Sequence, residues 1–186
     1  KERLNPGGKK LVLVVGGSLG AMKINDVVCD YIKSFRKENV KFIVSTGKRD
    51  YGRVKEMLGG KDKGENFEIF AYIHDMDAYL AASDLVICRS GAITLSEICI
   101  LKKASILIPS PNVTHNHQEF NASALVKNGA AVMIKESNFD TSELKKAVDL
   151  LLDNNALRKQ YGENAYKMAK KDATKLICES ILKFAK

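Results

Sequence analysis

The sequence predicts an α/β domain with a Rossmann-like parallel sheet, helices on both faces of that sheet and a helical C-terminal end. Short apolar runs alternate with longer amphipathic segments over the first 135 residues, as in parallel sheets whose strands are joined by helices. The runs are almost continuously apolar and β-branched, which is typical of strands buried on both faces. After residue 135 only helical patterns remain.

Six β-like runs predict six strands, and right-handed crossovers between them give a doubly wound sheet. In chain order they are residues 11–15, 41–45, 67–70, 85–88, 104–108 and 131–134. Five amphipathic segments predict the connecting helices, at residues 21–37, 50–58, 76–82, 94–101 and 117–127.

The C-terminal part is expected to contain helices only. In "TSELKKAVDLLLDN", Leu144, Val148 and Leu151 stand at helical spacing after Thr141, a residue type that caps helix N-termini. Two more helical segments follow. We therefore expect one domain over 1–186, with a linker at 1–9, a Rossmann-like core at 10–135 and C-terminal helices at 136–186. Because the chain begins with Lys1 and not Met, we expect it to be a piece of a longer protein.

Composition narrows the classes of protein. No apolar run approaches the ~20 residues of a membrane span. Cysteines 29, 88, 99 and 178 form no CxxC pair, which predicts reduced thiols that serve packing in a cytosolic protein. The net charge of +8 is compatible with nucleic acid or an anionic membrane surface. The lysines are spread over many helical segments, however, so a solvated lysine-rich surface is favoured and no nucleic acid partner is expected.

The first candidate site is the loop "GGSLGA" after the first predicted strand. Ligands of open α/β sheets bind beyond the carboxyl ends of the strands. Glycines such as Gly17 allow the backbone to approach a ligand, the following helix N-terminus offers free N–H groups to an anion, and Ser18 adds a hydroxyl. A tight turn without a ligand fits the same residues.

A second small-residue turn follows the fourth strand in "CRSGAITLSEI". Arg89 ends the strand and Gly91 precedes a helix. Two such turns at one edge of a sheet favour phosphate binding more than one turn does. Glu97, one turn into the helix, suits a ribose diol or simply complements the helix dipole.

The third segment, "PSPNVTHNHQEFNASAL", is rich in side-chain amides that suit a sugar. The amide of Gln118 can donate to one hydroxyl and accept from a neighbouring one. A zinc site at His115 and His117 is the alternative, but no third ligand is spaced for it. A nucleophilic pair of Cys88 with a histidine is equally unsupported, since Cys88 ends a buried strand.

Together, "VLVVGGSLGAMKIN", "AASDLVICRSGAITLSEI" and "HNHQEFNA" resemble the C-terminal domain of the MurG family. These are the UDP-N-acetylglucosamine transferases that convert lipid I to lipid II in peptidoglycan synthesis. The resemblance implies one half of a GT-B glycosyltransferase, the nucleotide-sugar domain, without the N-terminal acceptor domain.

The resemblance also implies residue roles. Ser18 would hold the diphosphate, the backbone of Ile73 would read uracil and Glu97 would bind the ribose hydroxyls. The remaining phosphate and sugar contacts would come from Ala92, Ile93, Thr94 and Gln118. Secondary candidates are Gly17, Arg89, Gly91, Glu119 and Asn121. Leu19 stands where many members have glutamine, and Glu119 stands where some members have a second glutamine.

The activity implied is an inverting displacement at the anomeric carbon with UDP as leaving group. We expect no catalytic residue in this chain, no metal and no cofactor, so the chain alone would bind the donor without transferring sugar. The whole protein would be cytoplasmic and peripheral on the cytoplasmic face of the membrane, where its missing domain meets lipid I. The alternatives are the donor domain of another GT-B UDP-sugar transferase, such as a glycolipid synthase, a non-catalytic nucleotide-sugar-binding module, and a basic nucleic-acid-binding domain.

Overall fold

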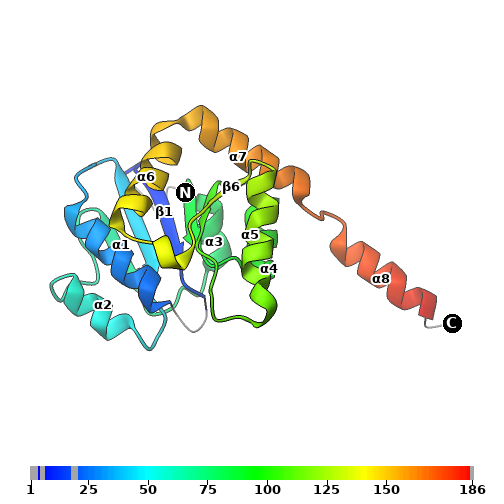
Figure 1. Cartoon of the computed structure of the whole chain (residues 1–186), viewed down its shortest axis with the longest axis horizontal. Helices are drawn as coiled ribbons and strands as arrows, with labels where there is room; N and C mark the ends of the chain where they lie inside the picture. Colours follow the sequence, from blue (N-terminus) through cyan, green and yellow to red (C-terminus); the bar gives the residue numbers. More distant parts are fainter. Residues whose placement is uncertain (1–3, 5–6, 18–20, 185–186) are drawn as a thin grey trace.

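All six strands are parallel and lie in one sheet, in the order β3-β2-β1-β4-β5-β6 (Figure 1). The computed structural model describes Leu4 and residues 7–17 and 21–184. The strands are β1 (Lys10–Val15), β2 (Val40–Ser45), β3 (Phe67–Phe70), β4 (Leu85–Cys88), β5 (Ser105–Leu107) and β6 (Ala131–Met133). All six predicted strands are confirmed, with ends that move by one residue at most.

The strand order is that of the Rossmann fold, in which the chain direction across the sheet reverses beside the first strand. Val14 of β1 is in register with Val44 of β2 on one side and with Ile87 of β4 on the other. The crevice at the carboxyl ends of β1 and β4 is therefore the place where ligands of such sheets bind.

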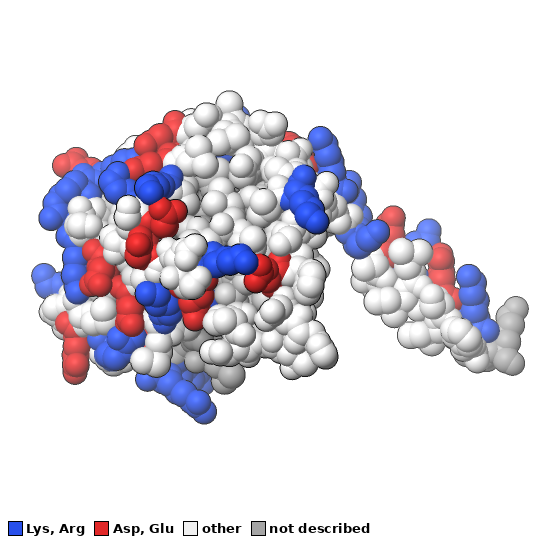
Figure 2. Space-filling model, viewed as in Figure 1, with Lys and Arg blue, Asp and Glu red and all other residues white. Residues whose placement is uncertain are grey.

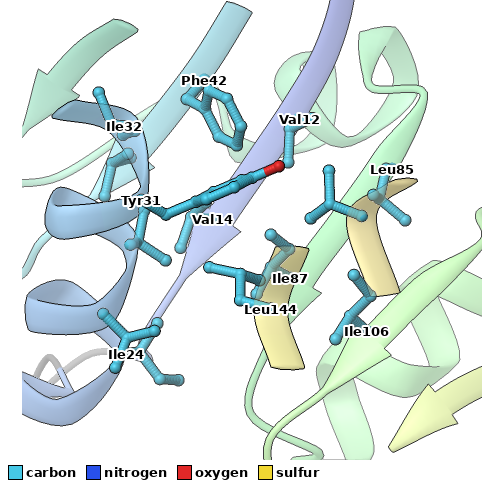
Figure 3. Close-up of a cluster of buried hydrophobic side chains, with 14 of the residues drawn as sticks. Val12, Val14, Ile24, Tyr31, Ile32, Phe42, Leu85, Ile87, Ile106 and Leu144 are labelled. Atoms are coloured by element: carbon cyan, nitrogen blue, oxygen red, sulfur yellow. The ribbon is translucent and has the colours of Figure 1, made fainter. Parts of the chain in front are cut away.

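Two hydrophobic clusters hold the helices to the two faces of the sheet, because successive strand residues point to opposite faces. Val12 and Val14 belong to the first cluster (Figure 3), and Leu11 and Leu13 belong to the second. The first cluster packs against α1 (Met22–Ser34), α2 (Tyr51–Met57) and α6 (Thr141–Asp153). The second packs against α3 (Met76–Ala82), α4 (Ala92–Ile100) and α5 (His117–Lys127).

Helix α7 (Asn155–Met168) joins the two clusters. Its residue Leu157 packs on the first cluster and Ala165 lies in the second. Between them, a Cβ added at Gly162 would lie 2.3 Å from the carbonyl oxygen of Lys102, just after α4. The absence of a side chain at this position therefore allows α7 to cross α4 closely.

The start of α6 differs from the prediction. Asp140, not Thr141, is the N-cap, and its Oδ1 accepts a hydrogen bond from the backbone N–H of Glu143 at 2.9 Å. The cap needs extended backbone, which Asp140 has (φ −133°, ψ 178°), whereas Thr141 is already helical.

Helix α8 (Ala173–Phe184) projects away from the rest of the chain, and none of its residues is buried (Figure 1). Figure 2 shows charged side chains along one edge of it and uncharged side chains along the other. The prediction that all four cysteines serve packing is wrong for Cys178, which is exposed on α8, while the other three are buried. No helix of the described residues has the length and apolar character that a membrane crossing needs.

Candidate functional site

A cleft of about 700 Å³ lies at the carboxyl ends of β1 and β4. Its walls come from the β1–α1 turn, the β4–α4 turn, the β5–α5 loop and the segment after β6. A second cleft of about 520 Å³, beside Phe35 and Phe67, lies at the opposite end of the strands and contains none of the predicted site residues. The first cleft is therefore the candidate site.

Two helices begin at this cleft without a side-chain cap. The N-cap residues are Ala21 for α1 and Gly91 for α4, and neither helix has an acidic residue in its first turn. Among the described residues, no side chain accepts a hydrogen bond from these helix starts, so their N–H groups and the positive ends of their dipoles are open to an anion. Gly17, in the β1–α1 turn, has φ +92°, a conformation that favours glycine.

Lys23 lines the same cleft from the first turn of α1. A cation at a helix N-terminus is unfavourable by itself, and it becomes favourable when an anion binds beside it. Sequence reasoning missed this residue, although its position just after the glycine loop was a usable signal.

Hydrogen bonds join the start of α5, which forms one wall of the cleft, to the turn after β4. The buried Ser90 hydroxyl donates to the backbone oxygen of Gln118 at 2.7 Å, and Asn121 Nδ2 donates to the backbone oxygen of Ser90 at 3.1 Å. Asn121 is therefore engaged within the protein, and its predicted role as a ligand contact stays a prediction.

The amide of Gln118 lines the cleft with its orientation defined. Its Oε1 accepts from the backbone N–H of Ser110 at 2.9 Å. The amide oxygen has two lone pairs and can accept a second hydrogen bond, and Nε2 makes no hydrogen bond within the described residues. The expectation that this amide donates to one sugar hydroxyl and accepts from another stays a prediction.

Arg89 is held at the cleft by three partners. Its Nη1 donates to the backbone oxygens of Ile108 and Pro109, each at 3.1 Å. Its Nη2 forms an ion pair with Glu136, which begins a short 3₁₀ turn (Glu136–Asn138) after β6. Sequence reasoning missed Glu136, because this pairing depends on β6 lying beside β5.

The remaining secondary candidate, Glu119, lies next to this pair. Its Oε1 is 2.5 Å from Nζ of Lys135, and both side chains are about half exposed. It is therefore in an ion pair just outside the cleft lining, and a contact with a ligand stays a prediction.

Four predicted contacts are not in the cleft lining: Ile73, Ala92, Ile93 and Glu97. Ile73 is 3% exposed in the second cluster, and its backbone N–H and C=O make no hydrogen bond within the described part of the chain. Glu97 is exposed and borders a groove of about 520 Å³ formed by α4, α5 and the segment that joins α7 to α8. Ile93 is exposed at the start of α4, next to Ala92, while Thr94 lines the cleft itself. Ser18 and Leu19 lie outside the described residues.

The site offers no activated thiol. Burial raises the pKa of Cys88 to about 12, and the negative charge of Glu97 adds to this shift, so the thiol stays protonated at neutral pH. Over the residues that the structure describes, no three His, Cys, Asp or Glu side chains gather as metal ligands.

An open parallel sheet with two uncapped helix starts at its switch point defines the class: a Rossmann-like domain whose cleft suits an anionic, nucleotide-type ligand. The particular family follows from comparison with known proteins. The chain belongs to the glycosyltransferase family 28 C-terminal domain family, whose model matches residues 11–177.

Curated relatives support the same assignment. The chain is 42% identical over 178 residues to the UDP-N-acetylglucosamine–N-acetylmuramyl-(pentapeptide) pyrophosphoryl-undecaprenol N-acetylglucosamine transferase of Caldicellulosiruptor saccharolyticus. It is 39% identical over 178 residues to the transferase of the same name from Bacteroides thetaiotaomicron. Each match covers 95% of this chain and 48% of the relative, so the chain spans about half the length of the curated relatives it matches.

Solved structures confirm the fold class. MurG of Acinetobacter baumannii superposes with a TM-score of 0.82 at 27% identity, over 98% of this chain and 52% of that one. UDP-GlcNAc 2-epimerase of Neisseria meningitidis, solved bound to UDP-GlcNAc, gives a TM-score of 0.65 at 15% identity, over 98% of this chain and 47% of that one, which supports the fold alone. The predicted Rossmann-like half of a GT-B glycosyltransferase is thus confirmed.

Proposed function

We propose that this chain is the donor-binding domain of a UDP-N-acetylglucosamine transferase that converts lipid I to lipid II. The observation that carries the proposal is the pair of uncapped helix starts, at Ala21 and Gly91, that open into one cleft of a glycosyltransferase family 28 C-terminal domain. The identities of the donor and the acceptor in this proposal are taken from the names of the curated relatives.

The diphosphate of the donor would lie between the two helix starts, near Lys23 and Arg89. Thr94 and the backbone at Ala92 and Ile93 would contact the phosphates and the sugar, and Ser18 would add its hydroxyl. This placement follows from the free N–H groups and from the cations at the cleft, which favour negative charge.

The uridine and the sugar, on either side of the diphosphate, would be recognised by the residues around it. The unpaired backbone N–H and C=O of Ile73 can pair with the polar edge of uracil, and the exposed carboxylate of Glu97 can accept both ribose hydroxyls. Nε2 of Gln118 would donate to a sugar hydroxyl.

In the reaction, a hydroxyl oxygen of lipid I would attack the anomeric carbon with inversion. The bond from that carbon to the diphosphate oxygen would break, and UDP would leave with the electron pair. This domain would stabilise the charge that develops on the diphosphate. The base that accepts the hydroxyl proton would belong to an N-terminal acceptor domain, and the membrane contact on the cytoplasmic side would also lie there. Residues 1–9 would then be linker, 10–135 the core and 136–186 the C-terminal helices.

Calorimetry with UDP, UDP-N-acetylglucosamine, UDP-galactose and ADP tests the proposal. We expect UDP to bind more tightly than ADP, and Glu97→Ala to weaken UDP by about 1–3 kcal/mol, the range for hydrogen bonds to a charged group. Uracil, which has no ribose, should bind both proteins equally. Glu56→Ala, which removes an exposed carboxylate on α2, is the matched control.

Equal binding of UDP and ADP would contradict uracil recognition. A strong fall in the melting temperature of ligand-free Glu97→Ala would assign Glu97 to the helix instead. Preference for UDP-galactose would point to a different UDP-sugar transferase.

A further inference from the structure

The candidate cleft contains one carboxylate among its described lining residues, Glu136. The cations Lys23 and Arg89 line the same cleft, and two helix starts open into it. A carboxylate among groups that favour anions opposes the binding of any phosphate, so its presence requires an explanation.

Support of Arg89 is an incomplete explanation. The two backbone oxygens that accept from Nη1 of Arg89 already fix the direction of the guanidinium. The Oε2 atom of Glu136 is buried and in ion contact with Nη2, but this contact lacks hydrogen-bond geometry. What Glu136 adds at this place is chiefly its negative charge.

We propose that Glu136 is a specificity residue that makes the cleft favour a UDP-sugar over free UDP, and so promotes release of UDP after transfer. This inference rests on the proposed function. The diphosphate of a UDP-sugar carries two negative charges, because the sugar esterifies the terminal phosphate. Free UDP carries a third charge above the second pKa of a terminal phosphate, which is about 6.

The third charge is the one that Glu136 senses. It appears on the terminal phosphate, which in the proposed placement lies next to the sugar, and Gln118 and Glu136 line the same cleft. Both Glu136 and Arg89 have side chains less than about a quarter exposed (21% and 16%), so solvent screens this repulsion less than it would on an open surface.

The test measures three ligands at pH 8 without divalent cations: UDP, UDP-N-acetylglucosamine and uridine 5′-(methyl diphosphate). The methyl ester has the nucleotide and the two charges of the donor but no sugar, so it separates charge from sugar recognition. The variants are Glu136→Gln, which keeps the size of the side chain but loses the charge, and Glu136→Asp, which keeps the charge. Glu163→Gln, at an exposed ion pair with Lys102 outside the cleft, is the matched control.

We expect Glu136→Gln to tighten UDP about 3- to 10-fold more than it tightens the two esterified ligands, a scale set by one partly screened charge. Glu136→Asp and Glu163→Gln should keep the wild-type ratio between UDP and UDP-N-acetylglucosamine. Equal changes for all three ligands in Glu136→Gln, in either direction, would overturn the inference and leave the proposed function standing. A wild-type chain that binds none of the three would overturn the proposed function itself, and this inference with it.

Discussion

The helices of this domain begin in two ways. At α6 and α7, far along the chain from the glycine turns, Asp140 and Asn154 accept hydrogen bonds from the first-turn N–H groups of Glu143 and Leu157, each at 2.9 Å. At α1 and α4, the N-cap residues Ala21 and Gly91 offer no such acceptor. The uncapped starts of α1 and α4 line the cleft, and the capped starts of α6 and α7 do not. Helices α2, α3 and α5 also begin without a side-chain cap.

The capped helix starts contribute to the stability of the fold, whereas the uncapped starts at the cleft are available for ligand binding. A side-chain cap contributes about 1 kcal/mol to the stability of a helix. The starts of α1 and α4 go without that contribution, and their N–H groups remain available to a ligand that brings its own negative charge. In this domain, a bound anion would accept hydrogen bonds from the first-turn N–H groups that no side chain caps.

The largest expected effect comes from capping α4 artificially with Gly91→Asp. The backbone at Gly91 is extended (φ −67°, ψ 143°) and an added Cβ meets nothing within 4 Å, so an aspartate can cap the helix. The new carboxylate should weaken UDP by up to about 4 kcal/mol, the interaction of like charges at ~4 Å and an effective dielectric constant of 20. The ligand-free protein should be slightly more stable, by a few tenths of a kcal/mol. Calorimetry and thermal unfolding measure the two quantities.

Asp140→Ala is the mirror control for this variant. It removes the cap of α6, so unfolding should become easier by about 1 kcal/mol while UDP binding stays unchanged. If Gly91→Asp binds UDP as tightly as the wild type does, the uncapped start of α4 has no role in UDP binding, and the proposed difference between the two kinds of helix start is wrong.

The start of α2 offers an intermediate case. Asp50 is the N-cap residue, but its side chain accepts from Nε and Nη2 of Arg53 and from Nδ2 of Asn25 and does not cap the helix. The hydrogen bonds from Arg53 lower the pKa of Asp50 below its usual 3.8, against the opposing effect of burial, and Asn25 contributes in the same direction. This network ties α1 to the turn after β2, since Asn25 also donates to the backbone oxygen of Thr46.

Asp50→Asn should therefore reduce the free energy of unfolding at pH 7 by about 1–2 kcal/mol, discounted because Arg53 is partly exposed. A lowered folded-state pKa contributes stability above the unfolded value and loses it as the pH falls through the folded value. The difference between wild type and variant should thus shrink below about pH 4 in urea titrations. Asp30→Asn, at an exposed pair with Lys33, should change stability by under about 0.5 kcal/mol. A gap that is constant from pH 7 to pH 2.5 would exclude the ionised form of Asp50 as its source.

The smallest expected effect concerns Gln118, at the start of α5. Gln118→Ala should weaken UDP-N-acetylglucosamine by about 0.5–1.5 kcal/mol, the net value of a neutral hydrogen bond, and leave UDP nearly unchanged. The preference over UDP-galactose should shrink as well. Since Gln118 also binds the backbone of Ser110, Ser110→Ala serves as a control that keeps this backbone contact. Equal loss for UDP and UDP-sugar would assign Gln118 to loop support.

The fold could be predicted from local patterns of apolar and polar residues in the sequence. Each buried strand is a short apolar run flanked by turns, so strands such as residues 85–88 were found with correct ends. The cap of α6 was misplaced by one residue, because Asp140 and Thr141 are both capping types and only the backbone angles decide between them.

The site was harder to predict, because its polar partners are distant in the sequence. Arg89 and Glu136 meet only once β4, β5 and β6 are side by side. The engagement of the Gln118 oxygen by Ser110 depends on the path of the β5–α5 loop, which no residue spacing encodes. Glycine turns and helix starts are local features of the sequence, so the two turns that line the cleft could be predicted.

The projecting helix α8 has a consequence for how the molecule opens. With no buried residue, its hydrogen bonds gain little from tertiary packing, and a lone helix of about 12 residues is marginal in water. Its amides should therefore exchange with solvent through local helix–coil fluctuations, while those of β1 exchange only on global unfolding. We therefore expect the chain to unfold as two thermodynamic units with their boundary at the end of α7. There the ammonium groups of Lys102 and Lys171 lie 4.4 and 3.9 Å from the ring centre of Tyr166.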